Sequence, residues 1–427
     1  MDILLAFTQF ILIAVICVQE VKRKSPAIFL WATLMVMFGV MHTLSILTGN
    51  SEYDTKTLNE ASLFVIAFCG LYLCTRSIIC ASQNRQYPLV TWDSIENDIY
   101  NKTSFFGIIF LCVSFMICYN LVSFSGGLLD TSWSTGRDYS ASLNYANSNQ
   151  IYNILYFSFS GLPVYFWIKQ KKTASIVCLL AITFVTIITR NRILVLPLLV
   201  FILALFILKI KRLGIKHIVF AAVAGVLVIY VVYGLRVFRH YGTIEVFLRE
   251  FNFDEFLGKI NQYIATDNGE LGLRNDFYYF VAHDNQFNGF GEMASYIRML
   301  LVYIPTRFSF GLKPDDFAQT MGAAVGMVVG GSTHPTLFGD CYANAGVGGI
   351  FLGVFWAIYC SISDKIVHCC KNQLLKTLVY SLFAVTFVII GRGSVYNSFF
   401  FVAWGVPALW IITKIIEKMP RIKIKIR

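Results

Sequence analysis

The side chains best suited to chemistry in this chain are arginines that stand at the ends of long apolar stretches. A guanidinium group presents a planar fork of donors that suits bidentate binding of phosphate, which the ammonium group of lysine does not. A charge at the edge of an apolar stretch is costly and is often functional. Gathered in one cavity, these arginines would bind a diphosphate at a membrane surface. They are Arg190 and Arg192 in TRNR, Arg236 and Arg239 directly behind an apolar stretch, Arg392 in GRGS, and Arg137 in GRDY.

Each arginine also has a plainer interpretation. An arginine can lay its stem along apolar surface and place its charge among lipid headgroups, or it can pair with an acid such as Asp138. For any single arginine this interpretation is the more common one. The clustering of several is what favours an anion site.

A second group of polar residues lies in STHPTLFGDCYAN, residues 332–344, just before an apolar stretch. His334 opens this group. Asp340 is the last acid before the stretch, and capping the following helix is its alternative role, because a carboxylate suits the positive end of a helix dipole. Tyr342 and Asn344 complete the group.

Motifs for metals and cofactors are missing from the sequence. It contains no His-x-x-x-His, no cysteine pair with zinc spacing and no glycine-rich phosphate loop. Glu52-Tyr53-Asp54 is the nearest approach to an acidic metal motif, and it is weak. We therefore expect no metal site and no cofactor.

The elements that position these residues must be membrane-spanning helices. The chain has 427 residues, of which 57% are hydrophobic and 14% charged, with a mean hydropathy of +0.65. A soluble protein carries about 25% charged residues, so the composition argues against a water-soluble globular enzyme. The apolar runs are continuous rather than alternating, which indicates helices and not a barrel. We predict an all-α polytopic fold with about 11 spans: 3–18, 26–48, 61–81, 105–122, 151–168, 173–189, 193–208, 218–235, 344–362, 374–390 and 397–416.

Lysine and arginine are concentrated in alternate connections and in the C-terminal tail. Short cytoplasmic loops retain positive charge, so these connections are predicted to lie inside, with the N-terminus outside and the C-terminus inside. Among the positive charges of the short outer connections, only Lys56 is not an arginine. The net charge of +11 then reflects topology, and no nucleic-acid partner is expected. Residues 1–18 lack a basic start and indicate a retained span rather than a signal peptide.

The predicted organisation has three parts. Residues 1–235 form the first eight spans, residues 236–343 form a large outer loop, and residues 344–427 form the last three spans and a basic tail. Within the large loop, 244–265 has the apolar stripe of an interfacial helix, and 294–304 suits a re-entrant or interfacial helix. Glycines at 322, 326 and 330 indicate a close-packed turn or a mobile flap.

A shorter outer loop, 123–150, is rich in Ser, Asn and Tyr. Amides, hydroxyls and aromatic faces are what a protein offers to sugar rings, and Asp138 and Tyr139 are the candidates in this loop. The same composition is also that of an ordinary solvated loop.

The chain resembles the Wzy-type oligosaccharide repeat-unit polymerases, the O-antigen polymerases of bacterial inner membranes. The features that carry the resemblance are the number of spans, the long outer loop late in the chain, GRDY at 136–139, the arginine-bearing turn at 189–192 and HPTLFGDCYANAGVGG at 334–349. The chain departs from the family in lacking a clean Arg-x10-Gly pair in its outer loops and in having Asp340 where a Glu is expected.

The resemblance implies a GT-C-like membrane glycosyltransferase that works without a metal. Such an enzyme moves a growing glycan from undecaprenyl diphosphate onto an incoming lipid-linked repeat unit at the periplasmic face of the inner membrane. Arg190, Arg192 and Arg236 are then expected at the diphosphate, with Arg239, Arg392 and Arg137 as further candidates. His334 is the expected base, with Asp340 as its orienter or as the alternative base. Asp138, Tyr139, Tyr342 and Asn344 are the candidates for glycan binding.

The resemblance also implies partners: lipid-linked glycan substrates, membrane lipids and a chain-length-regulating co-polymerase. Three other functions remain open. An O-antigen ligase shares the donor and the membrane setting. A flippase or transporter for the same lipids would show internal repeats, and none is evident in the sequence. A non-catalytic scaffold leaves the arginine-bearing turns unexplained.

Overall fold

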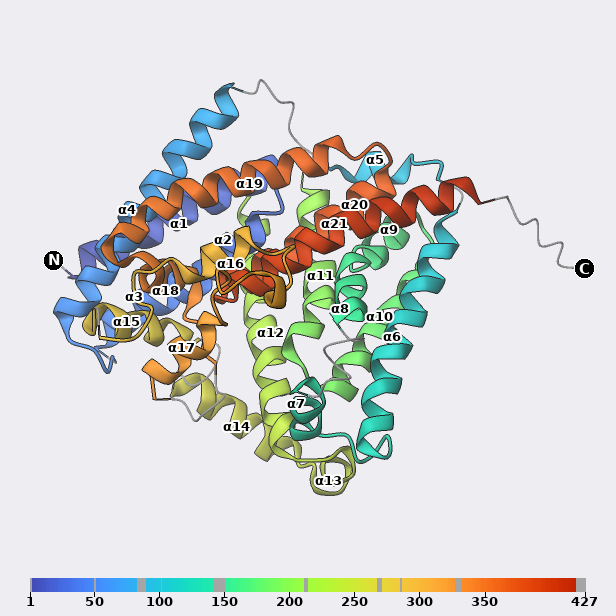
Figure 1. Ribbon diagram of the computed structural model, residues 1–427, viewed down its shortest axis with the longest axis horizontal. Helices are drawn as coiled ribbons and strands as arrows, with labels where there is room; N and C mark the ends of the chain where they lie inside the picture. The colour runs from blue at the N-terminus through green and yellow to red at the C-terminus, as the bar shows by residue number, and fades with distance from the viewer. Residues whose placement is uncertain are drawn as a thin grey trace, which may run out of the picture.

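The computed structural model describes residues 2–49, 51–82, 90–100, 102–141, 150–210, 214–266, 271–284, 286–326 and 332–419 (Figure 1). The described residues form helices and connections but no strand; an isolated bridge between Ser132 and Thr243 is the nearest feature. Ten helical segments among them are long and apolar enough to cross a membrane. The predicted all-α, multi-pass architecture is therefore confirmed.

Each of the ten segments covers one predicted span. Four of them are broken by a change of helix type or a short turn, as in the second, where a π-helical stretch joins two α-helices. The segments are α1 (Asp2–Arg23); α2 (Ile28–Leu34), η1 (Met35–Met41) and α3 (His42–Thr48); α4 (Thr55–Ser82); α6 (Thr103–Ser125); α8 (Gln150–Ser158) and α9 (Leu162–Ile168); α10 (Lys172–Thr189); η3 (Arg192–Val195) and α11 (Leu196–Lys209); α18 (Thr336–Ala345), η5 (Gly346–Phe351) and α19 (Leu352–Cys369); α20 (Gln373–Gly391); and α21 (Val395–Lys418).

One predicted span remains, 218–235. It lies within α12 (Ile215–His240), a continuous helix of 26 residues. It is not among the ten segments. The residues 218–235 contain no charged side chain, so α12 as a span stays a prediction.

The remaining helices are short and lie between the spans. The single helix predicted for 244–265 is wrong: Phe251 is extended, and the side chain of Asn252 caps a new helix by accepting from the backbone of Asp254 at 3.0 Å. The helix predicted for 294–304 ends at Leu300. Gly322 lies in a helix and Gly326 follows that helix with φ of +79°, whereas residue 330 lies outside the described residues. These helices are α5 (Trp92–Glu96), α7 (Trp133–Ala141), α13 (Ile244–Glu250), α14 (Phe253–Ala265), α15 (Leu273–Ala282), α16 (Ala294–Leu300), η4 (Thr306–Phe308) and α17 (Phe317–Ala324).

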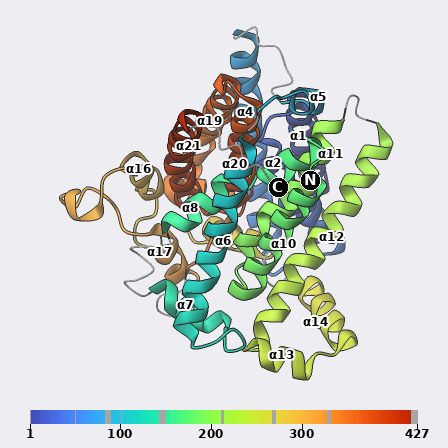
Figure 2. The ribbon, with the colours of Figure 1, turned by 90° about the vertical axis from the view of Figure 1, so that its right-hand side faces the viewer.

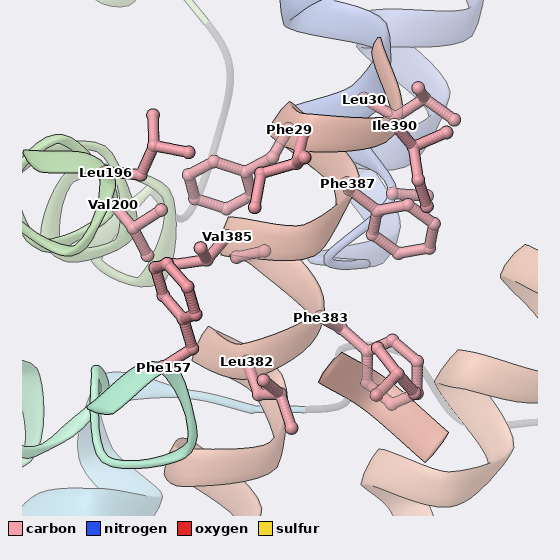
Figure 3. Close-up of a cluster of buried hydrophobic side chains, with 14 of the residues drawn as sticks. Phe29, Leu30, Phe157, Leu196, Val200, Leu382, Phe383, Val385, Phe387 and Ile390 are labelled. Carbon is pink, nitrogen blue, oxygen red and sulfur yellow. The ribbon is translucent and has the colours of Figure 1, made fainter. Parts of the chain in front are cut away.

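Helix α20 lies at the centre of the bundle. Its sequence is apolar on all sides, as expected of a helix surrounded by protein, and nearly all its residues are buried. Figure 3 shows Val385 and Phe387 of α20 among Phe29 of α2, Phe157 of α8 and side chains of α11. Gly161 permits the approach of α9, since a Cβ there would lie 2.7 Å from the carbonyl oxygen of Thr377.

A group of charged side chains is buried between α1, α4 and α19. Arg76 of α4 donates from Nε and Nη2 to Glu20 of α1, both at 2.9 Å, and from Nη2 to Asp364 of α19 at 2.5 Å. Two acids face two arginines, so the group is formally neutral. We call it the Arg76 cluster, and its members are Glu20, Arg23, Ser25, Tyr72, Arg76, Ser361 and Asp364.

Connections predicted to lie on the same side of the membrane contact each other. At the basic end, Lys102 donates to the backbone oxygen of Met419 at 2.6 Å, and Lys24 donates to that of Leu208 at 2.7 Å. At the other end, the backbone of Glu245 donates to Leu129 at 3.4 Å. The alternation of the chain through the membrane is therefore consistent with these contacts, and which end faces the cytoplasm stays a prediction.

Candidate functional site

The start of α18 has an unusual backbone. Thr336 has φ of +68°, and a β-branched residue rarely adopts this left-handed conformation. Its backbone nitrogen donates to the carbonyl oxygen of Arg392 at 3.2 Å. Gly393 has φ of +97°, and a Cβ there would lie 2.6 Å from that same nitrogen. The GRGS turn between α20 and α21 is thus pressed against the His334–Thr336 segment.

Helix α15 anchors the other side of His334. The hydroxyl of Thr333 donates to the carboxylate of Asp276 in α15. Burial raises the pKa of Asp276, and the hydroxyl of Thr333 opposes part of that rise. His334 is therefore held between α15 and the α20–α21 turn.

Asp340 lies in the second turn of α18 with 1% of its surface exposed. Its predicted alternative role as a helix cap is wrong, because α18 begins at Thr336 and the N-cap position is Pro335. One carboxyl oxygen, Oδ2, accepts from the hydroxyl of Ser295 at 3.1 Å. The other, Oδ1, is buried and has no hydrogen-bond partner within the described part of the chain. Buried polar atoms in proteins are nearly always paired, so this exception calls for an explanation.

His334 and Asp340 line one small pocket with about 20 Å³ of enclosed space. The pocket lies between α16, which contributes Ser295 and Arg298, the beginning of α17, and residues 393–397 at the α20–α21 turn. The two residues singled out in the sequence for acid–base chemistry thus meet at the same site. Their meeting depends on the strained entry to α18 and on the glycine of the adjacent turn.

Arg298 is the pocket residue that the sequence analysis missed. Its Nη1 donates to the carbonyl oxygen of Pro314 at 3.2 Å, and its guanidinium carbon lies 4.5 Å from the ring centre of Tyr396. Its Nε is buried without a hydrogen-bond partner among the described residues. Lys313 lies 5.8 Å from the same ring, so two cations flank Tyr396. A lone arginine within the apolar run of 294–304 was the signal that could have identified it.

Arg190 and Arg239 connect the end of α10 with the residues before α7 and after α12, away from the pocket. Arg190 ends α10 with φ of +49°, is fully buried, and donates to the carbonyl oxygens of Gly242 and Thr131, the latter at 3.3 Å. Arg239 donates from Nε to the carbonyl oxygen of Arg190 at 2.8 Å and stacks on Trp133 at 3.7 Å. Burial lowers the pKa of Arg190 to about 10, which leaves it charged at neutral pH. We call these five residues the Arg190 corner.

The other predicted arginines are spread over the structure. Arg236 stacks on Tyr263 with its guanidinium carbon 4.7 Å from the ring centre, and Arg192 begins η3 half-buried. Neither lines the pocket, nor does the Arg190 corner. Arg392 does not line it either, but its turn continues directly into the pocket wall at Gly393. The side chain of Arg137 lies outside the described residues.

The predicted glycan-binding residues have varied surroundings. Asn344 is fully buried and holds α16 against α18, since its Oδ1 accepts from the backbone of Ser295 at 2.9 Å. The ring of Tyr342 packs 5.4 Å from that of Phe64. Tyr139 is buried with its ring 5.1 Å from Phe124, and Asp138 is exposed. Of these four residues, only Asp138 has an open surface.

The described part of the chain contains no group of three or more His, Cys, Asp or Glu side chains placed to hold a metal ion. No protein-family model, curated protein or solved structure matches this chain.

Proposed function

We propose that this protein is a membrane glycosyltransferase that joins lipid-linked oligosaccharide repeat units, a repeat-unit polymerase of the outer face of a bacterial inner membrane. The observation that supports the proposal is the pocket in which His334 and Asp340 lie together, with Arg298 in its wall and the Arg392 turn beside it. An acid with an unpaired oxygen, a histidine and a guanidinium group match the chemical demands of the reaction.

The acceptor sugar loses a proton from a hydroxyl group as that oxygen bonds to the anomeric carbon of the donor. In this proposal Oδ1 of Asp340 or the ring of His334 takes the proton. The free lone pairs of Oδ1 suit this role because no group of the described residues donates to them. Ser295 holds the other oxygen of the carboxyl group and fixes its direction.

The bond from the anomeric carbon to undecaprenyl diphosphate breaks, and the leaving diphosphate gains negative charge. Fixed cations stabilise such a charge. Arg298 is the first candidate because it lines the pocket, with its guanidinium carbon 4.5 Å from the ring centre of Tyr396. Arg392 is the second. This assignment moves the diphosphate away from Arg190, which does not line the pocket.

The size of the pocket limits what it can hold. Its enclosed space is about 20 Å³, which holds about one water molecule. In this proposal the walls of the pocket move apart to admit the reacting sugar and the diphosphate, and the rest of each glycan extends over the outer loops. A co-polymerase that sets chain length would act on that outer part.

The test is a lipopolysaccharide gel of a deletion strain complemented with the wild type or with Asp340→Asn. The proposal expects the wild type to restore the ladder and the variant to leave core plus one repeat. A matched control is Glu250→Gln, which changes an exposed acid on α13 and should restore the ladder.

Other outcomes would overturn the proposal. Bare core in the deletion strain assigns the protein to ligase or flippase function. An unchanged ladder and unchanged capsule in the deletion strain removes the polymerase proposal altogether. A full ladder from Asp340→Asn removes the catalytic role of Asp340.

A further inference from the structure

The segment between α16 and α17 carries a concentrated set of exposed apolar side chains. We call residues 300–313 the apolar loop. Leu300 is 83% exposed, Phe310 93% and Leu312 72%. Tyr303, Ile304 and Phe308 are exposed as well. In Figure 2 the residues that follow α16 project sideways beyond α21. Water alone is a poor environment for such a surface.

The apolar loop has a defined shape. Its base is closed by Lys313, which donates to the carbonyl oxygen of Ile304 at 2.9 Å, and by the contact of Arg298 with Pro314. Within it, the backbone nitrogen of Phe308 donates to Pro305 at 2.9 Å, and that of Leu312 donates to Ser309 at 2.9 Å. Phe310 is held at φ of +50°. The loop therefore presents its side chains from a backbone folded by several internal hydrogen bonds.

Contacts with α21 locate the loop relative to the membrane. The hydroxyl of Tyr303 donates to the carbonyl oxygen of Ala403 at 2.8 Å, and its ring lies 5.2 Å from that of Trp404. At about 1.5 Å per residue, Ala403 is about 22 Å along α21 from Lys418 at its basic end. A hydrocarbon core is about 30 Å thick. Tyr303 thus meets α21 at the level of the opposite leaflet.

We propose that the apolar loop enters the interface of that leaflet and binds lipid. Phe308, Phe310 and Leu312 lie among the upper acyl chains, and the exposed Arg307 lies at the phosphates. Aromatic and basic side chains together are typical of a segment in the interface. The exposed surface continues onto lipid-facing Trp404 and Trp410 of α21, which are exposed in the bundle. This continuity favours lipid over a protein partner.

The loop also borders the pocket. Arg298 and Lys313, which close its base, are the two cations that flank Tyr396 in the pocket wall. The reacting groups therefore lie next to a surface in contact with lipid. Insertion of the loop stands without the polymerase proposal, because it rests on exposure and on the contacts with α21.

The experiment is photo-crosslinking of the full-length protein in native membranes. The photoreactive residue p-benzoylphenylalanine replaces Phe310, or Trp410 on the lipid-facing side of α21, or the exposed Gln286 in the polar turn after α15. After irradiation, the purified protein is analysed by mass spectrometry for phospholipid adducts. We expect adducts from the positions of Phe310 and Trp410 at yields about tenfold above that of Gln286.

Two results would overturn the inference. One is a lipid adduct at the position of Trp410 with none at that of Phe310. The other is a protein adduct in place of lipid at Phe310, which would assign the loop to a protein interface. The position of Trp410 confirms in each case that the membrane sample is reactive.

Discussion

Two groups of charged side chains are buried among the helices, and they differ in how their polar atoms are paired. In the Arg76 cluster, every carboxylate oxygen of Glu20 and Asp364 accepts a hydrogen bond, and Arg76 donates from all three of its nitrogens. In the pocket, Oδ1 of Asp340 and Nε of Arg298 have no such partner within the described ranges. The hydrogen bonds of the first group are all made within the protein, whereas the second group has an acceptor and a donor that a ligand could pair.

The difference has an energetic meaning. A buried polar atom left unpaired costs about 1–3 kcal/mol, so a fold that served stability alone would pair it. Completing a charged group, as in the Arg76 cluster, is the usual solution inside a protein. The contrast is between a fully paired cluster and a pocket with unpaired atoms, and substitutions in the two regions test whether the first is structural and the second chemical.

The largest effect is expected at Asp340. Asp340→Asn keeps the shape and the contact with Ser295 but removes the ability to accept a proton, so polymer formation should fall by about 10²- to 10⁴-fold. The measurement is ladder intensity at matched protein level, together with the melting temperature of the purified protein. Loss of the protein itself, rather than of its product, would make Asp340 a structural residue like Asp364.

Breaking the Arg76 cluster should act on stability. Arg76→Met leaves the buried carboxylate of Asp364 without a cation and that of Glu20 with Arg23 alone, and should lower the free energy of unfolding by about 3–5 kcal/mol. Thermal unfolding in detergent and protein abundance measure this loss, while activity per folded molecule should stay near that of the wild type. A matched variant, Arg76→Met with Glu20→Gln and Asp364→Asn, removes the stranded charges and should recover part of the stability. A stable but inactive Arg76→Met protein would contradict the structural role.

Arg298→Lys tests whether the pocket needs a guanidinium group or only a positive charge. Lysine keeps the positive charge but loses the planar fork and the stacking on Tyr396, so we expect about a tenfold loss of activity, and a larger loss for Arg298→Ala. The ratio of the two variants is measured from ladder intensity at equal protein level. Full activity of both would remove Arg298 from the proposed diphosphate site.

The smallest effect is expected at the Arg190 corner. Arg190→Met removes the donor to the carbonyl oxygens of Thr131 and Gly242, which should cost about 1–3 kcal/mol of stability. Activity of the folded fraction should change little. Loss of activity without loss of stability would restore the diphosphate role that the sequence predicts for Arg190.

The sequence was sufficient to predict the membrane-spanning helices but not the points at which helices break or begin. Runs of about 20 apolar residues require helices in a membrane, and ten predicted spans correspond to helical segments in the structure. The break at Asn252 was missed because the apolar stripe continues on both sides of it, and only the cap shows that a new helix begins. The early start of α18 was missed because Thr336 adopts a backbone conformation that its residue type does not predict.

The candidate site was predicted in part. His334 and Asp340 are close in sequence, and a short segment brought them to one pocket. Where each arginine side chain lies depends on partners far along the chain. Arg190 donates to the carbonyl oxygens of Thr131 and Gly242, which are 59 and 52 residues away. Residue type and position relative to a span cannot specify such partners. Arg298 was overlooked because it lies in a run interpreted only as an interfacial helix.

The Arg76 cluster also has a consequence for how the protein is made. Glu20 and Arg76 enter the membrane early in synthesis, whereas Asp364 follows Arg76 by 288 residues. Until α19 is inserted, two arginines share a single acid, and a net positive charge remains between α1 and α4. Arrival of Asp364 neutralises that charge and joins the first helices of the chain to its last third. A chain that stops before α19 keeps this imbalance of charge between α1 and α4.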